Sequence, residues 1–271
     1  MTDKTVDIAL LLDSHFIEEW QEKALKNLKY SKKVDIRINL LIIKKDNMRN
    51  SYCSKKNSFL SKVSNKGLFI LYKKARKAAK PKPWYRRAKP ISEIDFINDF
   101  DRLECRPMST PDLGNKLPPH AVEKLTNVDI GIRFGFGILK GDALTAPNYG
   151  ILSYHHGNLT EYRGKPAGFY EYMHNKPTAS VTIQKLNESL DGGQVVLMNT
   201  IDISDAKSWN AVKSDLFHES TNMLAEAISR CIFKPEKITK PKELGDLYFT
   251  PTNKLVLSYL KKQLYRKIIS K

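Results

Sequence analysis

The chain has 271 residues, which is long enough for one large or two modest domains. Its hydrophobic fraction of 41% is ordinary for a globular protein with a core. No stretch approaches the roughly 20 apolar residues that span a bilayer, and the short N-terminal apolar run ends in Asp13 without a small-residue cleavage site, so we expect neither a membrane span nor a signal peptide. Three scattered cysteines without CxxC spacing argue against a disulfide framework and indicate a reducing, cytoplasmic compartment.

The formal net charge of +17 is concentrated in two segments. Residues 44–90 hold 16 Lys and Arg but one acid, Asp46, and residues 254–271 hold six basic residues and no acid. The rest of the chain is therefore slightly acidic. Two interpretations stay open: a solvated, lysine-rich surface, and a surface that binds phosphate or another polyanion.

The first elements predict a parallel sheet. Val6–Leu12 is an apolar run typical of a buried strand, residues 15–30 carry apolar residues at helical spacing, and residues 34–43 form a second strand rich in Ile and Leu. Strand, helix and strand of this length make a βαβ unit with a right-handed crossover.

Residues 44–90 interrupt this alternation as a basic insertion. We expect a helix over residues 58–80, followed by a turn-prone stretch that contains Trp84 and Tyr85. Aromatic rings among cations can stack on a base or a sugar. We favour the simpler interpretation, in which the two rings anchor a loop to the body of the protein.

Regular alternation resumes at Ile91. We expect strands over residues 128–134, 150–155, 180–186 and 194–202, the third half-exposed because its polar and apolar residues alternate, with helices over residues 119–125, 169–174, 209–232 and 252–270 and turns at 135–137 and 139–144. The prediction is an α/β fold in which helices cover both faces of a Rossmann-like, mostly parallel sheet. Residues 1–205 form the main domain and 206–271 a short helical C-terminal extension.

Chemistry-bearing residues gather at the end of the strand over 150–155. The carboxyl ends of parallel strands open into the ligand crevice, and His155 lies at such an end. Period-2 geometry places Ser153 and His155 on one face, with His156 on the other. Asp191 follows later in a Gly-flanked loop between two strands, where the backbone can bend close to a ligand.

These residues resemble the formyltransferase family, which includes methionyl-tRNA, glycinamide ribonucleotide and sugar N-formyltransferases. His155 matches the family histidine at a strand end, Tyr162-Arg163-Gly164 a downstream triplet, and Asp191-Gly192-Gly193 the Asp-x-Gly loop, with similar spacing between His155 and Asp191. Upstream, Asp129 to Ile132 and Phe136 to Leu139 are similar to the family's strand and folate-contacting loop. The resemblance covers roughly residues 120–205 well and residues 44–118 hardly at all.

The resemblance implies transfer of a formyl group from 10-formyltetrahydrofolate to an amine. His155 would act as an acid/base or cationic stabiliser, and Asp191 would orient it. Pterin contacts, made largely by the backbone in this family, map to the segments Phe136, Gly137, Ile138, Leu139 and Asn187, Glu188, Ser189, Leu190. The chain departs from the pattern where Ser153 replaces the family Asn and His156 the family Pro. Serine has a hydroxyl on a shorter arm in place of the amide donor. Three alternatives stay open: the hydroxyl acts through a water, His156 or a backbone N–H substitutes for the amide, or the activity is weak or altered.

A nucleotide-linked amino sugar, or another small amine, is the acceptor we favour, because residues 206–271 suggest two helices and not the barrel domain of the tRNA enzyme. The remaining substrate-binding candidates are His156, Tyr162, Arg163, Arg86 and Arg87, with Arg76 as a further cation for a diphosphate. Two alternatives stay open: an RNA- or tRNA-directed protein, and a folate-binding non-transferase or hydrolase that results from Ser153. The histidines have no metal-ligand spacing, so no metal is expected, and the C-terminal helix is compatible with a homodimer.

Overall fold

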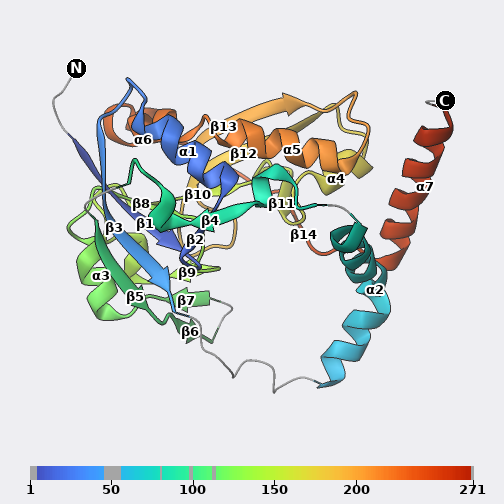
Figure 1. The fold of residues 1–271 in the computed structure, drawn as a ribbon, viewed down its shortest axis with the longest axis horizontal. Coiled ribbons are helices and arrows are strands. Elements are labelled where there is room, and N and C mark those ends of the chain that lie inside the picture. Colours follow the sequence, from blue (N-terminus) through green and yellow to red (C-terminus); the bar gives the residue numbers. More distant parts are fainter. Residues whose placement is uncertain (1–4, 46–55, 80, 98–99, 112–113, 270–271) are drawn as a thin grey trace.

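The computed structural model describes residues 5–45, 56–79, 81–97, 100–111 and 114–269. Its centre is a seven-stranded sheet in the order β13-β12-β10-β8-β1-β3-β5 (Figure 1). The strands are β1 (Val6–Leu12), β3 (Ile36–Lys44), β5 (Asp101–Cys105), β8 (Ile130–Arg133), β10 (Ile151–His155), β12 (Thr178–Lys185) and β13 (Gln194–Asp202). In the sheet order, neighbouring strands from β10 to β5 pair in parallel. β12 pairs antiparallel with β10, and β13 pairs antiparallel with β12. The predicted α/β class with a mostly parallel sheet is confirmed.

Alternating side chains give the central strands of the sheet two buried faces. In β1, Ile8 and Leu10 join a core cluster that includes residues of α1 (Glu19–Lys29), α5 (Trp209–Ser220) and α6 (Leu224–Phe233). Ala9 and Leu11 join the opposite cluster, with residues of α3 (Pro119–Leu125) and the short helix η3 (Asp142–Leu144). Helices therefore cover both faces of the sheet, as β-strands buried on both sides require.

Small sheets tie the loops to this body. They pair β2 (Phe16–Glu18) with β4 (Ala88–Pro90), β6 (Met108–Thr110) with β7 (Gly114–Lys116), β7 with β9 (Leu139–Lys140), and β11 (Tyr162–Gly164) with β14 (Asp246–Tyr248). Three short helices, η1 (Trp84–Arg86), η2 (Ile91–Glu93) and η4 (Pro235–Lys237), and helix α4 (Phe169–Met173) complete these connections. The β11–β14 pair joins residues far apart in the sequence beside the end of β10.

Two helices project away from the sheet (Figure 1). α2 (Lys56–Ala79) contacts α7 (Asn253–Ile269), and the hydroxyl groups of Tyr72 and Tyr259 lie 3.3 Å apart between them. The helix predicted over residues 58–80 is thus present. Trp84 and Tyr85, which follow it, anchor their segment as favoured: the Tyr85 ring stacks on Phe217 at 4.3 Å, and Trp84 Nε1 donates to Ser214 Oγ.

Four details differ from the sequence expectations. The first helix begins only at Glu19, because residues 16–18 pair with β4 and Glu18 forms a capping box with Gln21. Polar residues of β12 are buried and the strand is not half-exposed: Thr182 donates to the Gly157 carbonyl. β5 was not foreseen, since its charged residues do not form an apolar run.

The fourth difference is the helix expected over residues 209–232, which is in fact two helices. α5 ends at Ser220, whose hydroxyl donates to the Leu216 carbonyl, and Thr221 donates to the His218 carbonyl. Side-chain hydroxyls that compete for helical carbonyls favour such an end. α5 and α6 both bury apolar residues against the sheet.

Two cysteines, Cys105 and Cys231, are buried free thiols, and Cys53 lies outside the described residues. Among the helices of the described ranges, none combines the length and apolar character needed to cross a membrane. Nor do these ranges bring three or more His, Cys, Asp or Glu side chains together in a way that could hold a metal ion.

Candidate active site

His155 ends β10 with both ring nitrogens engaged. Its Nε2 lies 3.0 Å from the Tyr162 carbonyl oxygen, and its Nδ1 lies 3.5 Å from Asp191 Oδ1. The side chain is only 6% exposed. Burial lowers the pKa of the imidazole, but Asp191 and the Tyr162 carbonyl raise it more, so the net pKa lies above its ordinary value. The geometry therefore favours a histidine that is readily protonated.

Asp191 is held in place by its backbone conformation and by a hydrogen bond from Gly164. Its φ of 45° is left-handed, and the Gly164 N–H donates to Oδ2 at 3.2 Å. Burial raises the pKa of this carboxyl, but His155, the Gly164 N–H and Arg133 lower it more, so the net pKa is below its usual range. Asp191 is therefore ionised beside His155, and the two residues predicted to act together are adjacent.

Ser153 lies on the same face of β10 as His155 and is 2% exposed. Arg133, its neighbour in the adjacent strand β8, donates to Ser153 Oγ from Nε at 3.1 Å and from Nη2 at 2.8 Å. Burial lowers the pKa of this guanidinium, whereas the carboxylates of Asp191 and Asp13 raise it. Arg133 was missed in the sequence analysis, although its place at the end of a parallel strand was a usable signal.

His156 points to the other face of the sheet and into an aromatic cluster. Its ring lies 4.2 Å from that of Phe217 and 5.6 Å from that of Trp20, and its Nε2 is 3.0 Å from Ser220 Oγ. Burial lowers its pKa to about 3, helped by the charges of His155 and Arg86. His156 is thus neutral, although it also borders a pocket.

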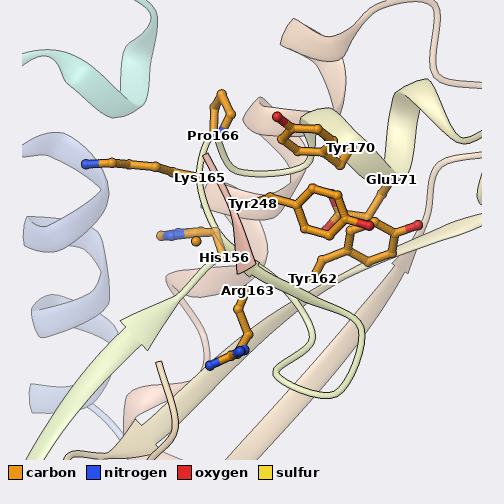
Figure 2. Close-up of a pocket in the computed structure, with 9 residues that line it drawn as sticks. His156, Tyr162, Arg163, Lys165, Pro166, Tyr170, Glu171 and Tyr248 are labelled. Atoms are coloured by element: carbon orange, nitrogen blue, oxygen red, sulfur yellow. The ribbon is translucent and has the colours of Figure 1, made fainter. Parts of the chain in front are cut away.

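This pocket combines residues of β11, α4 and β14 (Figure 2), and it includes Tyr162, whose carbonyl oxygen lies 3.0 Å from His155 Nε2. Tyr248 is its centre: its ring lies 5.2 Å from that of Tyr162 and 4.2 Å from that of Tyr170. Glu171 lies against the tyrosines with only 4% exposure, and burial raises its pKa to about 7. The pocket therefore offers aromatic faces and one acid that titrates near neutral pH. The full lining is His156, Tyr162, Arg163, Gly164, Lys165, Pro166, Tyr170, Glu171 and Tyr248.

Glu171, Tyr170 and Tyr248 were not singled out from the sequence. The pattern showed residues 169–174 only as a short helix, and Tyr248 lies far along the chain. The signal that could have found Tyr170 and Glu171 is an acid among aromatic residues a few positions after the Tyr162-Arg163-Gly164 triplet.

The two segments predicted to contact folate lie side by side. The N–H of Gly141 donates to Glu188 Oε1 at 2.8 Å, which joins the loop after Leu139 to the segment 187–190. In that segment, Asn187 accepts from Ser189 N and donates to the Gly192 carbonyl, and Leu190 is 41% exposed.

In the first segment, some groups are already occupied. Phe136 is fully buried with a φ of 69°, and its N–H donates to Asp13. The carbonyls of Phe136 and Ile138 accept from the side chain and backbone of Asn115, respectively, while Gly137 is exposed and Leu139 is buried. Asn115 therefore competes for part of this backbone.

The predicted substrate arginines are mostly paired within the protein. Arg163 donates to the carbonyls of Gly245 and Leu190 and so links two loops. Arg86 pairs with Glu18, Arg87 with Glu19, and Arg76 donates to Asn210. The structure places Arg163 and Tyr162 at the pocket but does not include Arg76, Arg86 or Arg87 in its lining.

Comparison with known proteins identifies the family of the chain. A family model described as "Formyl transferase" matches residues 60–228, which is more than half of the chain. The chain belongs to the formyl transferase family. A methionyl-tRNA formyltransferase of Ehrlichia canis is 26% identical over 155 residues, which cover 55% of this chain and 49% of that protein. The match thus spans about half the length of the curated relative.

Solved structures of family members show the same fold. A glycinamide ribonucleotide transformylase of Symbiobacterium toebii matches with a TM-score of 0.53 and 16% identity over 91% of this chain and 96% of that one. An N-formyltransferase of Helicobacter canadensis, solved with folinic acid and dTDP-3-aminofucose, matches with a TM-score of 0.51 and 9% identity over 97% of this chain and 82% of that one. At these identities, the likeness concerns the fold.

Proposed function

We propose that this formyl transferase family member transfers a formyl group from 10-formyltetrahydrofolate to the primary amine of a small molecule, with a nucleotide-linked amino sugar as the favoured acceptor. The single observation that carries the proposal is the buried His155–Asp191 pair at the carboxyl end of β10, next to an aromatic pocket that contains Glu171. In this arrangement, His155 supplies a proton donor or cation beside Tyr162 of the pocket, and Glu171 in the pocket lining supplies an acid that can bind the amine.

Formyl transfer involves three events. The amine nitrogen forms a bond to the formyl carbon, the carbonyl oxygen takes up negative charge, and the bond from carbon to N10 of the folate then breaks while N10 takes a proton. His155, whose pKa is raised chiefly by Asp191 against the effect of burial, can stabilise the charge or supply the proton. Asp191 keeps the imidazole oriented and favours its cationic form.

The residues that line the pocket carry groups that can bind an amine. Protonated amines bind to carboxylates and to the faces of tyrosine rings, and Glu171 with Tyr248 and Tyr170 offers both. An attacking amine has to lose a proton, and an acid with a pKa of about 7 can accept it near neutral pH. Lys165, exposed at the pocket, is a cation for a phosphate group.

The folate would lie along segments 136–139 and 187–190, which the Gly141–Glu188 bond joins. Because Asn115 already binds two carbonyls of the first segment, the pterin would use its other backbone groups or displace Asn115. The structures of relatives with folinic acid support this class of cofactor.

A titration and a rate measurement test the proposal together. Saturable thermal stabilisation by 5-formyltetrahydrofolate is expected, because a ligand that binds only the folded protein stabilises it by mass action. Release of tetrahydrofolate from 10-formyltetrahydrofolate should depend on an added nucleotide-linked amino sugar. Absence of both effects would refute the proposal.

A tRNA acceptor is the second candidate, because the curated relatives include methionyl-tRNA formyltransferases. The basic segment 44–90 would then contact the tRNA backbone. This candidate predicts formylation of methionyl-tRNA and binding that weakens steeply with salt. Transfer to amino sugars combined with salt-independent or absent tRNA binding decides against it.

A further inference from the structure

Arg133 is bonded to Ser153, the residue that stands where the family has an Asn with an amide side chain. The strands β8 and β10 are in parallel register with Arg133 opposite Ser153, so both side chains emerge on the same face of the sheet. His155 emerges on this face as well, two residues further along β10. The three side chains are therefore neighbours near the carboxyl ends of the inner strands β8 and β10.

The Ser153 hydroxyl is committed to Arg133. Two guanidinium N–H groups point at Oγ, at 2.8 and 3.1 Å, and a hydroxyl oxygen has two lone pairs to accept them. A serine used in this way holds the guanidinium plane and fixes its direction. In the described part of the chain, Arg133 has no other hydrogen-bond acceptor, so three of its five N–H donors stay available.

The charge of Arg133 acts on the same site. Asp191 and Asp13 are the two carboxylates whose attraction opposes the effect of burial on the guanidinium. Asp191 is also the partner of His155, so Arg133, Asp191 and His155 form one electrostatic unit. A guanidinium stays protonated over the whole working pH range.

We propose that Arg133 is a catalytic residue that donates hydrogen bonds to the oxyanion of the tetrahedral intermediate, and that Ser153 is the residue that positions it. The assignment rests on the proposed formyl transfer. In the reaction, the C–N bond to the amine forms, the formyl oxygen becomes an oxyanion beside Arg133, the C–N10 bond breaks, and the proton lost by the amine ends on N10. Ser153 together with Arg133 thus replaces the single amide of the family's Asn.

The physical reason is that charge-assisted donors are stronger than neutral ones. A fixed guanidinium in a partly buried site is already oriented when the oxyanion develops, so little reorganisation is needed. Because Arg133 does not titrate, its contribution is independent of pH, whereas that of His155 is not.

Two variants test the assignment: Arg133→Ala, and the double variant Arg133→Ala with Ser153→Asn. Removal of one such donor typically lowers kcat by about 10²- to 10³-fold, and Arg133→Ala should do so with KM values within a few-fold. The double variant should recover part of the loss, because the amide of Asn supplies a donor where the hydroxyl cannot. Added methylguanidine should also restore part of the Arg133→Ala activity, which a purely structural role does not predict.

Arg230→Ala is the matched control. Arg230 is a half-buried arginine on α6 that binds Glu226 and the Val196 carbonyl, away from the site. Its loss should lower thermal stability without changing kcat. Stabilisation by 5-formyltetrahydrofolate, measured for every variant, separates loss of folate binding from loss of catalysis. Arg133→Ala should keep this stabilisation.

The outcomes distinguish the assignment from the proposed function. Hydrolysis of 10-formyltetrahydrofolate passes through the same oxyanion with water as the nucleophile, so it reports on Arg133 even when the added amine is not accepted. An active unmodified protein whose Arg133→Ala variant keeps its kcat, or loses folate binding in proportion, overturns the assignment alone. An unmodified protein that releases no tetrahydrofolate, with or without amine, overturns both.

Discussion

In the central sheet apolar side chains are buried, whereas in α7 apolar side chains at helical spacing lie on the surface. Leu10 and Leu152 are 0% exposed, while Leu257 and Leu264 are 49% and 61% exposed. Both sequences are rich in leucine or isoleucine, so composition alone does not distinguish them. The comparison indicates that the sheet provides stability and holds the candidate site, whereas the α7 stripe is suited to a contact with another surface.

The largest effect of a substitution, a loss of kcat, should come from the His155–Asp191 pair at the carboxyl end of β10. Asp191→Asn keeps the shape of the side chain but removes the charge that raises the pKa of His155. We expect a loss of about 10²- to 10⁴-fold in kcat, as for removal of an oriented acid/base pair. Steady-state release of tetrahydrofolate measures it. Asp202→Asn, on the exposed end of β13, is the control, and equal rates for the two variants would contradict the role of Asp191.

The stability contrast between the sheet and α7 is tested by two matched truncations. Leu152→Ala removes a fully buried side chain and should cost about 2–5 kcal/mol of unfolding free energy. Leu264→Ala should change it by no more than about 0.5 kcal/mol. Urea denaturation of both variants provides the values. Comparable losses would show that α7 is part of the cooperative core.

Glu171 should make stability depend on pH. Burial raises its pKa from 4.5 to about 7, so between these values the folded state binds more protons than the unfolded state. Stability attributable to this group therefore falls as pH rises from about 4.5 through about 7, by roughly 3 kcal/mol. Glu171→Gln should remove this fall. Parallel unfolding curves of the two proteins across this range would show that Glu171 is not buried as described.

Substitutions on α7 should have the smallest effect on the free energy of unfolding but a measurable effect on association between copies of the protein. Leu257, Leu260, Leu264 and Ile268 follow one another at helical spacing and are all exposed. If this stripe pairs with a copy of itself, Leu260→Lys with Leu264→Lys should convert a dimer to a monomer of unchanged fold. Light scattering measures the mass. A monomeric unmodified protein would refute the pairing.

Most strands of the central sheet could be predicted from the sequence, because they are apolar runs or regular alternations that are recognisable without knowledge of a partner strand. β1, β3, β8, β10, β12 and β13 fall within two residues of their expected bounds. β5 was missed because its charged residues become a strand only through pairing with β3. The adjacency of His155 and Asp191 followed from a motif, but the Arg133–Ser153 bond and the Glu171 pocket depend on which strands and loops are neighbours.

The β11–β14 pair has a consequence for how acceptor choice can change. Tyr248 on β14 and Tyr162 on β11 both line the pocket, with their rings 5.2 Å apart, and the two strands are bonded backbone to backbone. Exchange of the C-terminal segment with that of a relative would replace Tyr248 and leave His155, Asp191 and the segments proposed to bind folate in place. If the pocket binds the acceptor as proposed, such an exchange would alter the substrate range separately from the transfer chemistry, provided that the pairing register of β14 with β11 is preserved.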